Sequence, residues 1–179
     1  MDRRPIIFLD MDDLLVISRE YTSFQVLAIV KLGDLDSWPE LWTCLIFAEA
    51  RANLLALHQE FWPEYVISSS WANYLSLEQM QELLRRTNLE FVADNLHEAW
   101  TTPKSDGASR KDEIEGWLRE YRESSQPVLV IDDDNSGWSL LDSSFGQQYL
   151  VVLCKPWIGF VADKLAEAQR FLQIQMNRI

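Results

Sequence analysis

The chain has 179 residues, with 28 acidic and 16 basic side chains and a formal net charge of −12. Its 8 Trp, 8 Phe and 5 Tyr exclude an intrinsically disordered chain, because this much aromatic surface demands a buried core. The acid excess argues against an extended groove for a nucleic-acid backbone, which normally needs a basic face. A small basic pocket, or a metal ion among local acids, stays compatible with this charge.

Cysteine usage and the lengths of the apolar runs predict a cytoplasmic protein. Cys44 and Cys154 lie 110 positions apart and form no CxxC pair, so we expect free thiols in a reducing compartment. The apolar run after Arg4 is interrupted at Asp10, which leaves it too short for the hydrophobic part of a signal peptide. No uncharged run approaches the ~18 apolar residues of a membrane span, so no membrane partner is expected.

The first half of the chain predicts two buried strands with helices between and after them. Residues 5–9 form a continuous apolar run that ends in acids, which is typical of a buried parallel strand. Residues 20–45 hold apolar pieces around a turn-rich centre and favour no single element. The spacing of apolar residues predicts a helix over 47–61, and residues 65–67 predict a second strand. A third helix is expected over 76–86, with Ser76 as its N-cap.

The second half repeats the alternation of strands and helices. Residues 94–109 are interpreted as a loop, and a helix is expected over 109–122. Strands are predicted at 127–131 and 149–153, and a closing helix at 161–177. Strands that alternate with helices predict an α/β fold with a parallel sheet and helices on both faces. No repeat or linker divides the chain, so one domain over residues 1–179 is expected.

Four polar clusters come at the ends of predicted strands or at the start of a helix. Acids at positions 10, 12 and 13 follow the first strand, and Ser68, Ser69 and Ser70 follow the second. Arg110 and Lys111 open the helix over 109–122, and Asp132, Asp133 and Asp134 follow the strand over 127–131. Because the carboxyl ends of parallel strands share one edge of the sheet, the clusters that follow strands are expected to converge in a crevice.

The residue types in this crevice point to phosphoryl transfer beside a metal ion. Asp10, Asp12, Asp132 and Asp133 would repel one another unless a cation lay between them, and all-oxygen ligands suit a hard ion such as Mg²⁺. A hydroxyl from Ser68 and an ammonium from Lys111 would then hold an anion beside that metal. Catalysis of phosphoryl transfer consists mostly of such positioning and charge neutralisation.

Each of these signals is weak alone, and other folds place acids after strands. A P-loop NTPase requires GxxxxGK[ST], but no Gly in this chain is followed by Lys, and no GxGxxG dinucleotide motif occurs. A receiver domain would need a phosphoacceptor Asp after the strand over 65–67, where Ser68 stands instead. The order of the four clusters favours the metal and phosphoryl interpretation over solvated loop residues.

The four clusters also resemble the motifs of haloacid dehalogenase (HAD) superfamily phosphohydrolases, and more narrowly the HAD domains associated with RNA-repair proteins. The matching segments are IIFLDMDDLL, YVISSSWA, SRKDEIEGWL and VLVIDDDN, which extend from about residue 5 to 135. The resemblance implies a HAD-like (Rossmannoid) three-layer fold. Residues 20–45 would then form a minimal cap or flap, and so small a cap would leave an open crevice that admits a bulky substrate.

The resemblance also implies roles for the individual residues. Asp10 would be the nucleophile that forms an aspartyl-phosphate, and Asp12 the general acid and base. Ser68 would bind the transferring phosphoryl group, and Lys111 would stabilise the charge of nucleophile and phosphate. Ser69 and Arg110 are further candidates for phosphate binding, and it is open whether Lys111 or Arg110 enters the site. Asp132 and Asp133 would bind Mg²⁺, together with Asp10 and the main-chain carbonyl of Asp12.

One departure from the superfamily pattern bears on activity. The residue after the second motif aspartate is usually Gly, and here it is Asp13. Asp tolerates a left-handed turn better than most residues, but it adds a charge near the metal. We therefore expect a Mg²⁺-dependent phosphohydrolase whose substrate is a phosphorylated small molecule, a nucleotide or a nucleic-acid end. A catalytically silent HAD-like domain that senses a phosphorylated ligand is the alternative, and the oligomeric state is left open.

Several further residues are interpreted without a catalytic role. His58 and His97 have no partner at metal-ligand spacing and are expected to be structural or exposed. Trp71 and Trp138 follow the second and fourth clusters and are expected to pack, with a wall of the crevice as the alternative. The acids Asp142, Glu113 and Glu115 are interpreted as helix or loop residues.

Overall fold

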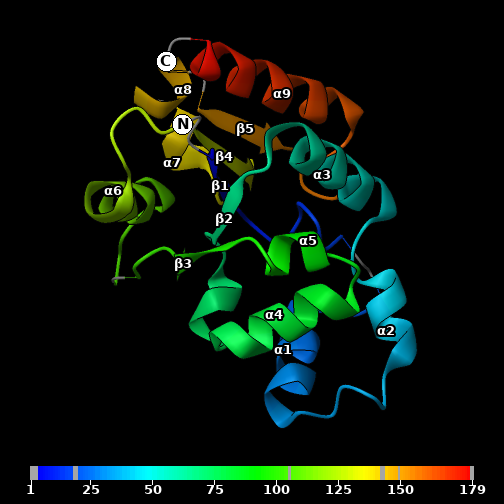
Figure 1. The fold of residues 1–179 in the computed structure, drawn as a ribbon. Coiled ribbons are helices and arrows are strands. Elements are labelled where there is room, and N and C mark those ends of the chain that lie inside the picture. The colour runs from blue at the N-terminus through cyan, green and yellow to red at the C-terminus, as the bar shows by residue number, and fades with distance from the viewer. Residues whose placement is uncertain (1–3, 18–19, 105, 142–143, 149, 178–179) are drawn as a thin grey trace.

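The computed structural model describes residues 4–17, 20–104, 106–141, 144–148 and 150–177, shown in Figure 1. The strands are β1 (Ile6–Leu9), β2 (Glu64–Ile67), β3 (Leu96–Thr101), β4 (Val128–Asp133) and β5 (Val151–Cys154). The helices are α1 (Ser23–Leu32), α2 (Pro39–Cys44), α3 (Ala48–Phe61), the 3₁₀ helix η1 (Ser70–Asn73), α4 (Leu77–Arg86), α5 (Glu90–Ala93), α6 (Arg110–Tyr121), α7 (Trp138–Leu141), α8 (Ser144–Gln147) and α9 (Ala162–Met176).

The five strands form one parallel sheet in the order β3-β2-β1-β4-β5. β1 lies in the centre, where Leu9 pairs with Ile67 of β2 and with Ile131 of β4. The central strands therefore end side by side, and the residues that follow them are neighbours across the sheet. This confirms the α/β class and the parallel sheet that the sequence predicts.

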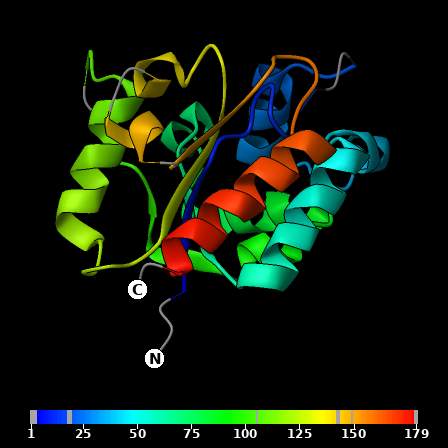
Figure 2. The same ribbon diagram turned by 90° about the horizontal axis from the view of Figure 1, so that it is seen from above.

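Helices cover both faces of the sheet, because successive side chains of each strand point to opposite faces. Ile6 and Phe8 belong to a core beneath α6, where the Trp117 ring packs edge-on against Phe8 at 5.1 Å. Ile7 and Leu9 belong to the larger core beneath α3, α4 and α9. Figure 2 shows α6 on one side of the strands and α3 with α9 on the other, which is the expected three-layer arrangement.

The helix starts follow from capping residues that the sequence shows. Ser76 and Ser109 are the N-caps of α4 and α6, and each forms a capping box with the residue three positions later. Trp62 takes a left-handed conformation after α3, where Pro63 follows. The strand expected over 149–153 forms β5 from Val151 onward, Leu150 comes just before it, and Tyr149 lies outside the described residues.

The expectation of a loop over residues 94–109 was wrong for its first part, which forms β3. Most of its residues are only half-buried, because β3 is the edge strand and only β2 pairs with it. Its pairing is also irregular, with a register shift between Tyr65 and Ile67 of β2. A half-buried edge strand carries little of the apolar signal by which buried strands are recognised.

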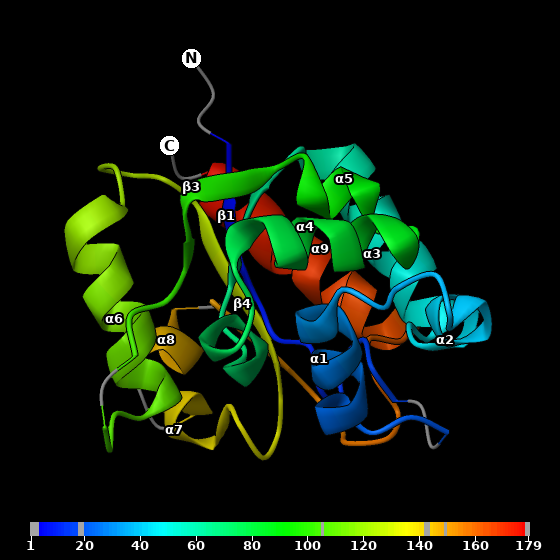
Figure 3. The ribbon, with the colours of Figure 1, turned by 90° about the horizontal axis from the view of Figure 1, so that it is seen from below.

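Residues 20–45, which the sequence does not resolve, form α1 and α2. Thr22 caps α1 in a capping box with Gln25, and Gly33 ends it in a left-handed conformation. The apolar side chains of both helices pack into the core that also holds β1 (Val26, Leu27, Val30, Leu41 and Trp42). Figure 3 shows α1 at the end of the molecule toward which β1 and β4 run. A cap or flap role for this segment stays a prediction.

Among the described helices, none combines the length and the apolar character that a membrane crossing would need.

Gly137 gives a test of how tightly the end of β4 is packed. A Cβ at this position would lie 2.6 Å from Leu153 Cδ2 and 3.2 Å from Asp132 Cβ. We expect Gly137→Ala to lower the free energy of unfolding by about 1–3 kcal/mol, measured by urea denaturation. The control is Gly116→Ala, where the closest contact is Pro103 Cγ at 3.3 Å and helix propensity favours Ala. Equal stabilities of the two variants would contradict this packing.

Candidate active site

The ends of three neighbouring strands bring the expected polar residues together. Asp10 and Ser68 follow the paired residues Leu9 and Ile67, and Asp132 follows Ile131 within β4. Asp10, Ser68, Asp132 and Asp133 are buried, with at most 2% of each residue exposed. Buried carboxylates need partners or a cation, since an isolated charge in the interior is strongly unfavourable.

Three carboxylates form a cluster that fits a metal ion. Asp10, Asp132 and Asp133 each offer an oxygen, and these atoms lie within 4.8 Å of one another. Main-chain N–H groups hold the β4 pair in place: Asp133 donates to Asp132 Oδ1 at 2.8 Å, and Asn135 donates to Asp133 Oδ1 at 2.7 Å. Asp10 Oδ2 is buried and has no hydrogen-bond partner among the described residues. A buried oxygen without a partner in an acidic cluster is what a hard cation would satisfy.

Crowding and burial raise the pKa values of two of these carboxyl groups, those of Asp10 and Asp132. Burial, followed by the charge of Asp132, holds the pKa of Asp10 well above its usual range, although Arg110 opposes the shift. Burial also raises the pKa of Asp132 to about 7, again against the effect of Arg110. The cluster therefore lacks positive charge even with Arg110 beside it, and a divalent ion would supply it.

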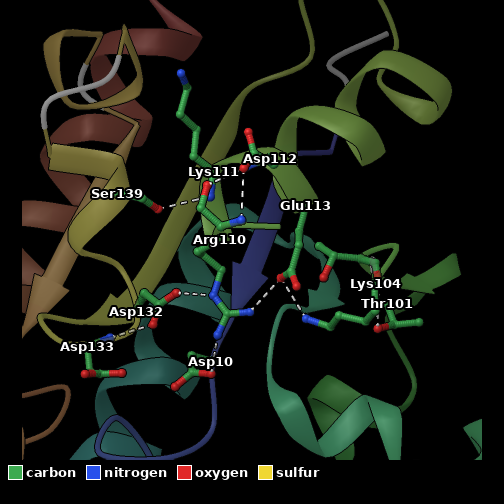
Figure 4. Close-up of polar contacts among 12 residues, drawn as sticks. Asp10, Thr101, Lys104, Arg110, Lys111, Asp112, Glu113, Asp132, Asp133 and Ser139 are labelled. Carbon is green, nitrogen blue, oxygen red and sulfur yellow. Dashed lines mark hydrogen bonds and ion pairs between the residues drawn. The ribbon is translucent and has the colours of Figure 1, made fainter. Parts of the chain in front are cut away.

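Arg110, and not Lys111, enters the site. Arg110 Nε donates to Asp132 Oδ2 at 2.8 Å, Nη2 lies 3.3 Å from Asp10 Oδ1, and the side chain is 10% exposed. Lys111 instead pairs with Glu115 at 3.6 Å, is 37% exposed, and points away from the carboxylates in Figure 4. This corrects the placement expected for Lys111. Successive helix residues point about 100° apart, so only one of the two can face the cluster once Ser109 has set the start of α6.

Lys104 and Glu113 are site neighbours that the sequence analysis missed. Glu113 Oε2 accepts from Lys104 Nζ at 2.7 Å and from Arg110 Nη1 at 3.1 Å, so one carboxylate joins both cations (Figure 4). Burial lowers the pKa of Lys104, and its hydrogen bond to Glu113 opposes that shift. Glu113 stands three positions after Arg110, a helical spacing that could have revealed the pair. Lys104 was hidden because β3, which delivers it, was not expected.

Asp12 is held beside the cluster by two donors. Ser23 Oγ donates to Asp12 Oδ1, and Trp71 Nε1 donates to Asp12 Oδ2 at 2.8 Å. Ser23 is the first residue of α1 and Trp71 lies in η1, so both helices fix this carboxylate. Trp71 is fully buried, as expected for a packing residue, and also orients Asp12. Trp138 begins α7 and is 68% exposed, so the expectation that this residue packs was wrong.

Three buried hydroxyl groups follow β2 and β3 and have no hydrogen-bond partner among the described residues. They belong to Ser68, Ser69 and Thr102. The Ser68 N–H donates to the Leu9 carbonyl oxygen at 3.0 Å, which holds this serine next to the end of β1. Buried hydroxyl groups normally have partners, so these side chains are available donors for an anion in the crevice.

Asp13 takes a left-handed conformation, which Asp tolerates better than most residues, with a φ of 55°. Its carboxylate accepts a hydrogen bond from the main-chain N–H of Trp157, in the loop between β5 and α9. Burial and the nearby charge of Asp133 raise the pKa of Asp13. The carboxylate that replaces the usual Gly therefore links two loops at the mouth of the site.

Two cavities adjoin the carboxylates. One of about 280 Å³ holds the cations and is lined by Lys104, Arg110, Glu113, Ser70, Asn73 and Ser136 among others. The second, of about 420 Å³, lies beside Asp12 and is lined by acidic, hydroxyl and aromatic residues, including Asp13, Tyr21, Ser23 and Trp157. The acid at position 12 thus faces a cavity distinct from the one that carries the positive charge.

Comparison with known families decides the assignment. The family described as "HAD domain in Swiss Army Knife RNA repair proteins" matches residues 6–165. The chain belongs to this family. Its sheet, its helices on both faces and its buried acidic cluster agree with a HAD-like Rossmannoid fold and a divalent metal site. Among curated proteins and solved structures, no match to the chain is found.

The residues expected to lie outside the chemistry of this HAD domain are also placed. His58 is buried and lies 3.2 Å from the Tyr65 hydroxyl, and His97 packs against the Trp117 ring at 4.8 Å, so both are structural. Asp142 lies outside the described residues.

The raised pKa of Asp132 predicts how pH affects stability. A carboxyl whose pKa rises on folding favours the folded state most below its unfolded pKa, and this contribution is lost as pH rises through the folded pKa. We compare the free energy of unfolding of wild type with that of Asp132→Asn in EDTA. As the pH rises from about 4 to about 7, we expect the value for wild type to fall by at least about 1 kcal/mol relative to the variant. Parallel denaturation curves at each pH measure this difference.

Asp112→Asn is the control for this measurement. Hydrogen bonds from Ser109 lower the pKa of Asp112, so its contribution is lost as pH falls, which is the opposite sign. A wild-type protein whose stability relative to Asp132→Asn does not fall with rising pH would contradict the raised pKa of Asp132.

Proposed function

We propose that this HAD domain is a Mg²⁺-dependent phosphohydrolase that acts on phosphate monoesters through an aspartyl-phosphate on Asp10. The observation that carries the proposal is the unpartnered Oδ2 of Asp10, buried at the end of β1 within the carboxylate cluster. The unpartnered hydroxyl of Ser68 stands at the next position across the sheet. A nucleophile and an anion donor are thus side by side, both without partners in the described protein.

In the first step, a carboxylate oxygen of Asp10 attacks the phosphorus atom, and the bond from phosphorus to the leaving oxygen breaks. Asp12 donates a proton to that leaving oxygen, and Trp71 and Ser23 hold its carboxyl group in place. The phosphoryl oxygens lie near Arg110, Ser68 and the smaller cavity, which also contains Lys104.

In the second step, Asp12 takes a proton from water, and the water oxygen attacks the phosphorus of the aspartyl-phosphate. The bond between phosphorus and the Asp10 oxygen breaks, which releases inorganic phosphate and restores both side chains. Since Asp12 gives one proton and takes one back, it must lie where both the leaving group and the water pass. The larger cavity beside Asp12 provides that position.

The residues that would hold Mg²⁺ are Asp10, Asp132, Asp133 and the main-chain carbonyl of Asp12. When bound, the ion supplies positive charge that offsets the carboxylates and the phosphoryl oxygens. Arg110 contacts two of these carboxylates and adds a further positive charge beside them. Lys104 reaches the same region through Glu113.

The substrate we propose is a phosphorylated small molecule, a nucleotide or a nucleic-acid end. The family description names RNA repair, which supports the last of these. The net charge of −12 supports contact with a nucleic-acid terminus over contact with a long stretch of its backbone.

A reducing, cytoplasmic setting agrees with the two free thiols of Cys44 and Cys154.

Removal of the nucleophile tests the proposal. We expect Asp10→Asn to lower the hydrolysis rate of an aryl phosphate with Mg²⁺ by about 10³-fold or more. The matched control is Asp134→Asn, an exposed acid at the end of β4, whose rate should stay close to that of wild type. Wild-type activity that persists in Asp10→Asn would eliminate the nucleophile assignment.

The two bases at the start of α6 give a second test. Arg110→Ala should lower kcat by about 10²–10³-fold, because it removes a positive charge that contacts the nucleophile. Lys111→Ala should change kcat by less than about 3-fold, since exposed ion pairs contribute little. Steady-state kinetics of both variants measure this contrast, and the reverse order would return the role to Lys111.

A catalytically silent domain that senses a phosphorylated ligand is the second candidate. The observation that favours it is Asp13, which stands in the position that is usually Gly and adds a carboxylate whose pKa burial and the nearby charge of Asp133 raise. Calorimetric titration with Mg²⁺, beside assays on phosphorylated metabolites and RNA ends, separates the two functions. Metal binding without hydrolysis of any of these compounds would support the silent domain.

A further inference from the structure

The cavity beside Asp12 has a composition that suits a particular leaving group. Its volume is about 420 Å³, which lies within the range of small-molecule sites. The described residues that line it include the aromatic side chains of Tyr21 and Trp157, the carboxylates of Asp12 and Asp13, and no Lys or Arg. The positively charged side chains line the other cavity instead. Among the described lining residues, a leaving group with a further phosphate would find no cation, whereas a planar neutral group would find two rings.

The loop that carries Trp157 is held in an unusual conformation. Trp157 has a φ of 65°, a left-handed conformation that is unfavourable for a bulky side chain, and it is 60% exposed. Gly159 follows with a φ of 79°, and a Cβ there would lie 2.8 Å from the Leu14 carbonyl oxygen. The Phe160 N–H donates to that same oxygen at 3.2 Å. The loop is therefore fastened to the segment after β1, which also carries Asp12.

Asp13 adds the second fastening. Its carboxylate accepts the main-chain N–H of Trp157, so the side chain in the usual Gly position holds the main chain that carries the indole. A strained backbone conformation persists only where the surrounding contacts hold it, and strained residues cluster at binding sites. The same carboxylate has further lone pairs, which can accept from the N–H groups of a base or from ribose hydroxyls.

We propose that this cavity binds the nucleoside of the leaving group, with the base against Tyr21 and Trp157. The inference rests on the proposed function, since it is the role of Asp12 as proton donor that places the leaving group here. A tyrosine phosphate would also bring a ring, but its phenol offers no N–H donor to Asp13. Base stacking on aromatic side chains tolerates any base, so the pocket recognises a nucleoside rather than one sequence.

The test compares two tryptophans with matching properties. Trp157→Gly removes the ring at a left-handed position in the cavity, and Trp62→Gly does so at a second left-handed position (φ of 49°) that is also 60% exposed. Trp62 comes just before β2, at the amino end of the strands and opposite the site. Because Gly accepts a left-handed φ without strain, both variants should stay folded, with melting temperatures close to that of wild type.

Binding is measured with adenosine, by NMR or calorimetric titration of the full chain, so the result does not depend on hydrolysis. We expect Trp157→Gly to weaken adenosine binding by about 10-fold or more, Trp62→Gly to leave it unchanged, and Trp157→Phe to retain most of it. In kinetics, Trp157→Gly should raise KM for adenosine 3′- and 5′-monophosphate but not for glycerol phosphate.

The outcomes separate the pocket from the chemistry. Adenosine binding that depends on Trp157 in a protein without hydrolytic activity would support the pocket and contradict the proposed function. Equal adenosine affinity in the two Gly variants, or no adenosine binding in wild type, would overturn the pocket. A phosphotyrosyl peptide that binds through Trp157 where adenosine does not would overturn the choice of a nucleoside.

Discussion

The mutual repulsion of carboxylates buried at the ends of β1 and β4 is the constraint on which the site depends. Asp10, Asp132 and Asp133 lie close together in the interior, where their charges are poorly screened. Main-chain N–H groups that donate to Asp132 and Asp133, and the guanidinium of Arg110, offset part of this repulsion. One carboxylate oxygen nevertheless keeps no partner in the described protein. The fold thus holds Asp10 in a state that a cation would relieve.

Charge is divided between the two sides of this cluster. Lys104 and Arg110 stand on one side, and the acids with the aromatic rings of Tyr21 and Trp157 stand on the other. A phosphate monoester has the same division, with its negative oxygens at one end and its organic group at the other. Asp12 lies on the side of the aromatic rings, held by Trp71. Under the proposed function, this arrangement would orient a substrate by charge before any specific contact forms.

The sequence predicted the parts of the site that depend on strands and missed those that depend on an edge strand or on helix phase. Asp10, Ser68 and Asp132 follow buried apolar runs, and parallel pairing alone brings such residues together. Lys104 could not be placed, because β3 is half-buried and irregularly paired. The choice between Arg110 and its neighbour depended on the rotational position of the first turn of α6, which adjacent residues in a sequence do not reveal.

The shared carboxylate of Glu113 has a consequence for the architecture. It joins Lys104, which is delivered by the edge strand β3, to Arg110, which is delivered by α6 on one face of the sheet. The stability of the outermost strand and the positive charge beside the acidic cluster are thereby linked. Fraying of β3 would withdraw one cation and leave Glu113 to draw Arg110 away from Asp10. The edge strand β3, which carries no residue of the acidic cluster, would then influence the electrostatics at the ends of β1 and β4.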